Sequence, residues 1–166
     1  MSQAADTDTR PFVIFRLGDE EYGLAIDRVR SIIRFEQATP VPRSAESVLG
    51  VINLRGTVIP VLDLASRLNR EAFVPAATSR IVVAEAAIGL VGLAVDAASE
   101  VTNIPVDAIK PTPESVLTAD TVAVFEGVAE RDGKLTILID LDEAIPRTQY
   151  VQALSSERAL EGDLDV

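Results

Sequence analysis

Hydrophobic residues along the chain gather in short runs rich in Val, Ile and Leu, and glycine, proline or charged residues separate these runs. Runs of this length and composition are typical of β-strands, and the separating residues are typical of turns. Residues 29–35 fit either a strand or a short turn of helix, whereas 38–47, with two prolines, reads as a loop. The pattern predicts strands over 12–17, 22–26, 80–84, 90–96 and 101–109.

Two stretches have the pattern of a hairpin. In residues 48–64, the apolar runs Val51-Ile52 and Val58–Leu62 flank a polar tip, Asn53-Leu54-Arg55-Gly56. Asn and Gly tolerate turn angles, so the tip is predicted to hold one positive charge in solvent. Pro60 has no N–H for a ladder, which predicts an edge or a bulge there. The second hairpin, within 122–141, turns at Asp132-Gly133, and a short helix is predicted over 64–69.

The chain contains an internal repeat. Gly23-Leu-Ala-Ile-Asp27 recurs in the second half as Gly92-Leu-Ala-Val-Asp96. The first hairpin recurs as well, with one constant offset, so that Gly50, Gly56 and Asp63 correspond to Gly127, Gly133 and Asp140. The repeat predicts two similar β units of four or five strands each, packed against one another because each is short for independent stability.

The composition limits the fold classes and the kinds of binding partner that are possible. The 166 residues suffice for about one domain, and aromatic residues are only 4%, so the core must be built from Val, Ile, Leu and Ala. This favours small barrels or sandwiches. The net charge of −11 repels phosphate backbones and argues against nucleic-acid binding. The N-terminus has no apolar signal region, and the longest apolar run, 86–95, is far shorter than the roughly 20 residues of a membrane helix, which predicts a soluble protein.

No residue pattern for catalysis or for a cofactor is present. The chain has no His and no Cys, which removes the usual nucleophile–base pairs and the imidazole or thiolate metal sites. It has no phosphate-binding glycine loop and no calcium loop. The acidic run Asp19-Glu20-Glu21 falls in a predicted turn and reads as a solvated loop. Four aspartates follow apolar strands and are expected to cap helices or form turns rather than act as acids: Asp27, Asp63, Asp96 and Asp140.

These motifs, taken in order, resemble the CheW family of bacterial chemotaxis coupling proteins. The resemblance rests on Gly18-Asp-Glu-Glu-Tyr-Gly23, on Gly50-Val-Ile-Asn-Leu-Arg-Gly56 and on Pro60-Val-Leu-Asp-Leu64. Ile109-Lys-Pro-Thr-Pro113 and Leu138-Ile-Asp-Leu141 continue it, so that it covers roughly 11–145. It implies an all-β fold with short helices, in which two intertwined five-stranded SH3-like β-barrels pack together. Residues 1–10 are then a disordered lead-in, and 146–166 are an acidic tail, partly helical or disordered.

The resemblance also implies a function. Members of the family are adaptors without catalytic activity or cofactors, and they link the cytoplasmic tips of chemoreceptors to the histidine kinase CheA. A receptor tip is an α-helical hairpin, so binding would place a helix in an apolar groove. Val58 and Lys110 match positions that face the kinase, whereas Ser115 departs from the aromatic that often stands there. The resemblance places six residues at the receptor groove: Val29, Ile32, Gly50, Asn53, Leu54 and Arg55.

Two other functions stay open. One is a scaffold of the same family in a motility or development pathway, and the other is a small double-barrel enzyme or ligand-binding protein. The missing His, Cys and phosphate loop count against the second. The expectation is therefore a cytoplasmic adaptor that is recruited to membrane receptor arrays and neither enters the membrane nor binds nucleic acid.

Overall fold

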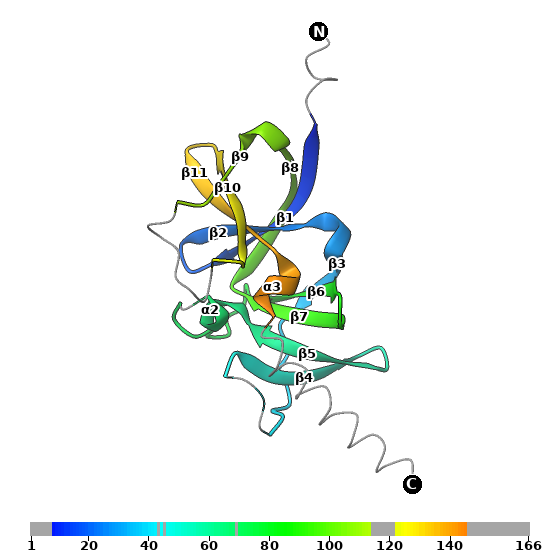
Figure 1. Cartoon of the computed structure of the whole chain (residues 1–166). Coiled ribbons are helices and arrows are strands. Elements are labelled where there is room, and N and C mark those ends of the chain that lie inside the picture. The colour runs from blue at the N-terminus through cyan, green and yellow to red at the C-terminus, as the bar shows by residue number, and fades with distance from the viewer. Residues whose placement is uncertain (1–7, 43, 45, 69, 114–121, 146–166) are drawn as a thin grey trace.

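The strands stack into two β-sheets, one above the other (Figure 1). This computed structural model describes residues 8–42, 44, 46–68, 70–113 and 122–145. Of the lead-in expected over 1–10, residues 1–7 lie outside the described residues, as do Ser115 and the expected tail 146–166. Thr9 and Arg10 already belong to the first strand, so the predicted disorder is wrong for them. The strands are β1 (Thr9–Leu17), β2 (Glu20–Ala25), β3 (Val29–Arg34), β4 (Val48–Leu54), β5 (Thr57–Asp63), β6 (Arg80–Ala86), β7 (Gly89–Val95), β8 (Ala97–Pro105), β9 (Ile109–Lys110), β10 (Phe125–Arg131) and β11 (Lys134–Ile139).

Four short helical segments join or follow the strands in the described part of the chain. The 3-10 turns η1 (Ile26–Arg28) and η2 (Val106–Ala108) precede β3 and β9. The α-helices α2 (Leu64–Arg67) and α3 (Leu141–Ala144) follow the two hairpins. Asp63 and Asp140 accept the backbone N–H of Ser66 (3.1 Å) and Glu143 (3.3 Å), so both cap a helix as expected.

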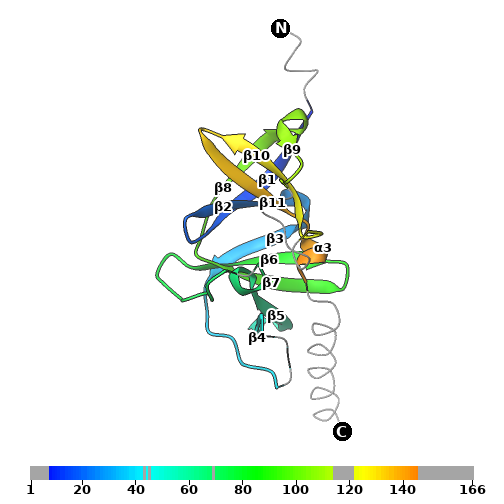
Figure 2. The same ribbon diagram turned by 60° about the vertical axis from the view of Figure 1, so that its left-hand side comes forward.

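The two halves of the chain exchange strands. Sheet A has the order β8-β1-β2-β11-β10-β9, and sheet B has the order β3-β6-β7-β5-β4. Each sheet therefore combines strands from before and after residue 79, and Figure 2 shows the chain passing between them. The expectation of two intertwined barrels is confirmed, although sheet A gains a sixth, two-residue strand. The two units that the repeat predicts are therefore not successive segments of the chain, because each half completes the other's sheet.

The strand registers reproduce the internal repeat. β3 pairs with β6 and β8 pairs with β1, and the same register shift interrupts both ladders at equivalent positions of the repeat. The hairpins β4–β5 and β10–β11 share a second shift, just before Gly50 and Gly127. A Cβ on these glycines would lie 2.1 Å from the Thr39 carbonyl oxygen or 2.8 Å from that of Lys110. Because neither glycine has a side chain, the segment that closes each barrel can approach the backbone there.

Three apolar clusters hold the fold together. The largest, here called the inter-barrel core, takes side chains from both sheets, including Phe15, Tyr22, Leu62, Val82 and Leu93. Of the two smaller clusters, one fills the inside of the sheet B barrel and the other fills the inside of the sheet A barrel. As composition predicted, aliphatic residues dominate all three. Because burying an aliphatic side chain contributes about 1.5–3 kcal/mol, the shared core binds the two barrels into one unit.

Of the edge or bulge predicted at Pro60, the edge is wrong, because β5 lies between β7 and β4. The β4–β5 ladder does have a register shift next to Pro60, between Val48 and Gly50. Parallel pairing with β7 begins only at Val61, so no hydrogen bond is required of Pro60 on that side. On the other side its partner is Val51, whose N–H and carbonyl both bond Thr39 at 2.8 Å. Pro60 therefore occupies a position in an inner strand where its missing N–H is not needed.

Candidate functional site

A bulge in β3 brings Val29 and Ile32 onto one face of sheet B. Residues three apart on a regular strand point to opposite faces. The register of β3 against β6 shifts between Val29 and Ser31, so that Val29 pairs with Ala84 and Ile32 pairs with Val82. Both partners belong to the inter-barrel core. Since directly paired residues share a face, Val29 and Ile32 both lie on the side of sheet B that meets the other barrel.

These two residues differ in exposure. Val29 is half-buried and packs against the inter-barrel core, whereas Ile32 is 42% exposed. Ile33, between Ile32 and the strand end, packs inside the barrel of sheet B. β3 therefore presents one anchored and one exposed apolar side chain beside the seam of the two barrels.

The hairpin tip is a two-residue turn, Arg55-Gly56, with φ angles of 54° and 87°. The pair of positive angles identifies a type I′ turn, which favours Asn or Asp at the first position. The equivalent turn of the second half obeys this preference with Asp132. An Arg in this conformation costs about 1–2 kcal/mol, so the turn sequence is not the one that folding alone favours. Asn53 supports the tip by accepting the Gly56 N–H at 2.8 Å.

The Arg55 side chain is exposed, and within the described residues it makes no hydrogen bond or ion pair. The hairpin projects from the body of sheet B (Figure 1). Leu54, by contrast, is partly buried and packs on the core inside that barrel. Gly50 is buried, and its lack of a side chain allows the backbone at Thr39 to approach closely. Of the four predicted receptor residues on this hairpin, Asn53 and Arg55 are the exposed ones.

β3 and the hairpin belong to opposite edges of sheet B, yet the barrel brings the edges together. The segment after β3 folds back so that Thr39 pairs with Val51 of β4. Ile33 of β3 and Leu54 of β4 pack on the same interior cluster. The predicted receptor residues therefore share the wall of one barrel.

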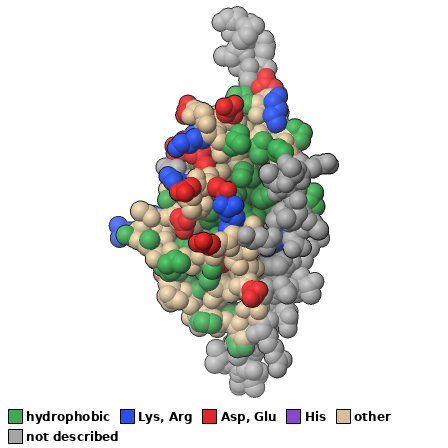
Figure 3. Space-filling model, turned by 90° about the vertical axis from the view of Figure 1, so that its left-hand side faces the viewer, with side chains coloured by type: hydrophobic (Ala, Val, Ile, Leu, Met, Phe, Trp, Pro, Cys, Tyr) green, Lys and Arg blue, Asp and Glu red, His purple; other side chains and the backbone are tan. Residues whose placement is uncertain are grey.

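The two predicted kinase residues are not brought together. Val58 lies directly across the ladder from Asn53 in sheet B, whereas Lys110 is on β9 of sheet A. Lys110 borders a groove of about 1000 Å³ whose apolar lining includes Phe125, Val128 and Leu135. Figure 3 views this side and shows hydrophobic side chains beside a band of acidic and basic ones. Leu135 is 62% exposed, so this groove is a second exposed apolar surface.

The sequence analysis missed two positions that the repeat pairs with Val29 and Ile32. Ala98 and Val101 are their equivalents in the second half and occupy the same places on either side of the bulge in β8. Ala98 packs against the inter-barrel core, and Val101 is 58% exposed. The repeated Gly-Leu-Ala-Ile/Val-Asp motif was the signal that could have identified them.

The interpretation of the acidic run as a solvated loop is wrong for two of its residues. Glu20 pairs with Arg70 (2.8 Å) and accepts the Tyr22 hydroxyl. Glu21 accepts hydrogen bonds from Arg131 and from the buried Thr136 hydroxyl (2.5 Å). Burial, followed by the contact with Glu20, raises the pKa of Tyr22 well above its usual range.

Arg131 also joins β10 to β8 across the mouth of the sheet A barrel. It donates to Glu100 (2.6 Å) and to the Thr102 hydroxyl (3.1 Å). The hydrogen bond from Thr102, together with Arg131, holds the pKa of the exposed Glu100 below its usual value. These groups are engaged with one another and form a structural network.

The described residues hold no group of three or more acidic side chains arranged to bind a metal ion. Among the same residues, no helix is long and apolar enough to cross a membrane. Two strand-exchanged barrels with exposed apolar side chains beside their seam and a cationic hairpin tip define a scaffold-type β module.

Comparison with known proteins identifies the family. A model described as "CheW-like domain" matches residues 11–149. The chain is 38% identical over 138 residues to "Chemotaxis protein CheW" of Rhizobium meliloti (strain 1021), covering 82% of this chain and 88% of that one. It is 30% identical over 145 residues to the protein of the same name from Bacillus subtilis (strain 168), covering 87% and 92%.

A solved structure agrees with these relatives. The crystal structure of scaffolding protein TtCheW from Thermoanaerobacter tengcongensis superposes with a TM-score of 0.77 at 34% identity, covering 87% of this chain and 94% of that one. The chain belongs to the CheW family of chemotaxis scaffold proteins, as the sequence resemblance predicted.

Proposed function

We propose that this protein couples chemoreceptors to a CheA-type histidine kinase, with the receptor tip bound along β3 and the β4–β5 hairpin. The observation that carries the proposal is the bulge in β3, which sets Val29 and Ile32 side by side at the seam. An exposed Ile at the rim of a core fits an apolar anchor of an α-helix. Arg55, with a free guanidinium on a strained turn, supplies a charge that orients the helix.

The kinase would bind a different surface. Lys110 and the apolar groove beside it lie on sheet A, away from the strands that carry the receptor residues. Two separate surfaces on one rigid body are what a coupling protein needs, because both partners must be held at once. Val58 is the exception, because it lies on the β4–β5 hairpin itself, opposite Asn53, and its contact with the kinase would be on that hairpin.

The first test concerns Arg55. Arg55→Glu should leave the unfolding midpoint unchanged, because the side chain is exposed, and should weaken binding of a soluble receptor-tip fragment by about 1–3 kcal/mol. Lys134→Glu is the matched control, since it makes the same charge change at an exposed site on the other hairpin. Equal affinities of the two variants would remove Arg55 from the receptor site.

The second test separates the two surfaces. Receptor-containing membranes are sedimented with the protein and kinase, the amounts of both proteins in the pellet are measured, and kinase phosphorylation is followed as a second readout. Arg55→Glu should reduce the amounts of this protein and of kinase in the pellet. Lys110→Glu should leave this protein in the pellet and reduce only the kinase. Failure of the wild-type protein to bring down kinase would overturn the proposed coupling.

A further inference from the structure

Two arginines face each other directly at the end of the predicted receptor surface. Arg34 is the last residue of β3, and its partner in the ladder is Arg80, the first residue of β6. Arg34 is two residues after Ile32, so it shares the face that carries the exposed isoleucine. Like charges directly opposite on neighbouring strands destabilise a sheet. Folding alone therefore gives no reason for this pair.

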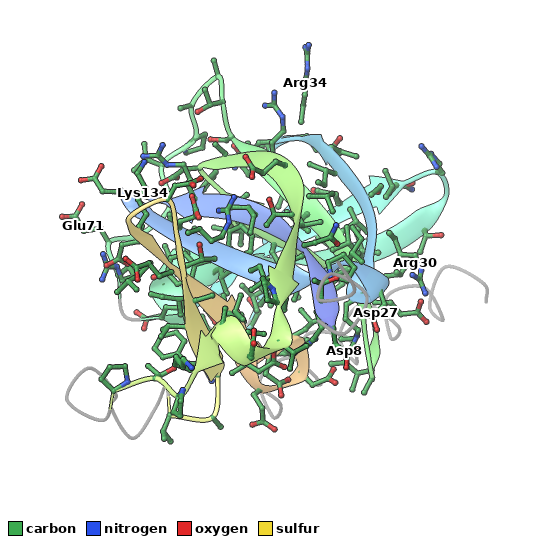
Figure 4. All side chains as sticks on the ribbon, turned by 90° about the horizontal axis from the view of Figure 1, so that it is seen from above. Asp8, Asp27, Arg30, Arg34, Glu71 and Lys134 are labelled. Atoms are coloured by element: carbon green, nitrogen blue, oxygen red, sulfur yellow. The ribbon has the colours of Figure 1, made fainter. Side chains whose placement is uncertain are left out.

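Other arginines near β3 are neutralised by acidic side chains. One guanidinium nitrogen of Arg28 donates to both carboxylate oxygens of Asp142 at 3.0 Å, and Arg30 forms an ion pair with Glu85. The Arg34 side chain makes no hydrogen bond or ion pair with any described residue. Figure 4 shows its side chain extending away from the ribbon, well apart from Arg30 and Asp27.

The guanidinium of Arg80 donates only to backbone carbonyls, those of Ser79 (2.8 Å) and Ala77 (3.3 Å). The acidic residue nearest to it along the ladder is Asp96, which follows Val95, the partner of Arg80 on β7. Asp96 is engaged elsewhere, because its carboxylate accepts the Gly18 N–H at 2.6 Å. In a chain with 26 acidic and 15 basic residues, this leaves two adjacent cations without a carboxylate partner among the described residues.

The internal repeat supplies a comparison within the same molecule. The residues equivalent to Arg34 and Arg80 are Asn103 and Pro11, which also pair directly with each other. The second barrel thus fills the same two places with uncharged residues. The fold does not require charges there, and of these two equivalent pairs the one at the end of β3 is cationic.

We propose that Arg34 and Arg80 together bind a carboxylate side chain on the helical partner that docks at Ile32. A planar guanidinium can bind a carboxylate in a bidentate geometry, and two guanidinium groups together fix the position of that carboxylate. The single exposed apolar anchor at Ile32 leaves the direction of the helix open, and a charged contact at the end of β3 fixes that direction. This inference rests on the proposed receptor-binding function.

The experiment measures the affinity of a soluble receptor-tip fragment, encoded in the same genome, for the full-length protein by calorimetry at about 50 mM and 300 mM salt. The double variant Arg34→Gln/Arg80→Gln should bind at least about tenfold more weakly at low salt, and less so at high salt. Lys134→Gln, which removes one exposed charge from the second hairpin, should stay within about twofold. The melting temperature of the double variant should be unchanged or higher, because a repulsion is removed.

Replacing acidic residues of the fragment one at a time by their amides should identify one whose loss weakens wild-type binding but leaves the double variant unaffected. Unchanged affinity of the double variant, alongside loss of binding in Ile32→Asp, would overturn the carboxylate site and leave the receptor groove standing. No binding by the wild-type protein would instead overturn the proposed function. If neutralising the chain's own Glu161, Asp163 and Asp165 strengthens binding only while both arginines are present, the tail is the occupant and the proposal is wrong.

Discussion

Gly50→Ala is predicted to lower the free energy of unfolding strongly, although it adds only one methyl group. Its φ of +145° is unfavourable for any side chain, and a Cβ there would lie 2.1 Å from the carbonyl oxygen and 2.5 Å from the carbonyl carbon of Thr39. Both are backbone atoms, so a rotamer change cannot relieve the contact. In Gly50→Ala the segment at Thr39 must move away from β4.

The cost can be worked from this geometry. The displaced segment loses two hydrogen bonds of 2.8 Å between Thr39 and Val51, each contributing about 0.5–1.5 kcal/mol. The backbone angle adds about 1–2 kcal/mol. The expected destabilisation is about 2–5 kcal/mol, a large part of the roughly 5–15 kcal/mol typical of a domain.

Urea denaturation followed by circular dichroism measures this change, with Gly56→Ala as the control. Gly56 also has a positive φ, of 87°, but nothing lies within 4 Å of its Cβ position. The control should therefore lose only the backbone contribution of about 1–2 kcal/mol. Amide exchange of Thr39 and Val51 should accelerate in Gly50→Ala alone. Equal destabilisation of the two variants would refute the argument that barrel closure depends on Gly50.

Two further predictions concern the aspartate caps and the acidic network. Asp63→Ala should lower the free energy of unfolding, measured by urea denaturation, by about 2–4 kcal/mol, because Asp63 is buried and also accepts the Phe73 N–H at 2.9 Å. Asp140→Ala should lose only the helix cap, about 1 kcal/mol. Equal losses in the two variants would contradict this prediction. Since the pKa of Glu100 is lowered in the folded state, its contribution to stability is present above the unfolded value of 4.5 and is lost as the pH falls through the folded pKa. The melting temperature of Glu100→Gln should therefore fall less between pH 6 and pH 3 than that of the wild type, and parallel curves would show that the network does not act on stability.

The sequence was most informative where a local pattern decides the structure. The turn residues at Gly56 and Asp132-Gly133 locate both hairpins, and Asp63 and Asp140 locate the helix starts, because each acts on backbone groups a few residues away. The repeated motifs of the sequence also fall on equivalent ladders of the two sheets. Local chemistry and duplication together therefore predict the elements and their order.

Long-range pairing decided what the sequence could not show. A repeat is compatible with two separate units or with exchanged strands, since both satisfy the same local patterns. Glu21 looked solvated because its partner Arg131 is 110 residues away. The shared face of Val29 and Ile32 depends on a bulge that is visible only in the register against β6.

A duplicated fold separates what folding needs from what binding needs. Where both halves keep the same residue type, the structure gives a folding reason: Gly50 and Gly127 admit a backbone, and Asp63 and Asp140 cap a helix. At three arginines of the first hairpin and of the β3–β6 pair, where the other half has no positive charge, no folding reason is found. Arg55 stands where the second half has Asp132, and the pair Arg34 and Arg80 stands where the other barrel has Asn103 and Pro11. All three arginines lie on sheet B or its hairpin tip, in the barrel that carries Ile32. The departures from symmetry and the exposed apolar anchor therefore support the same proposed binding surface.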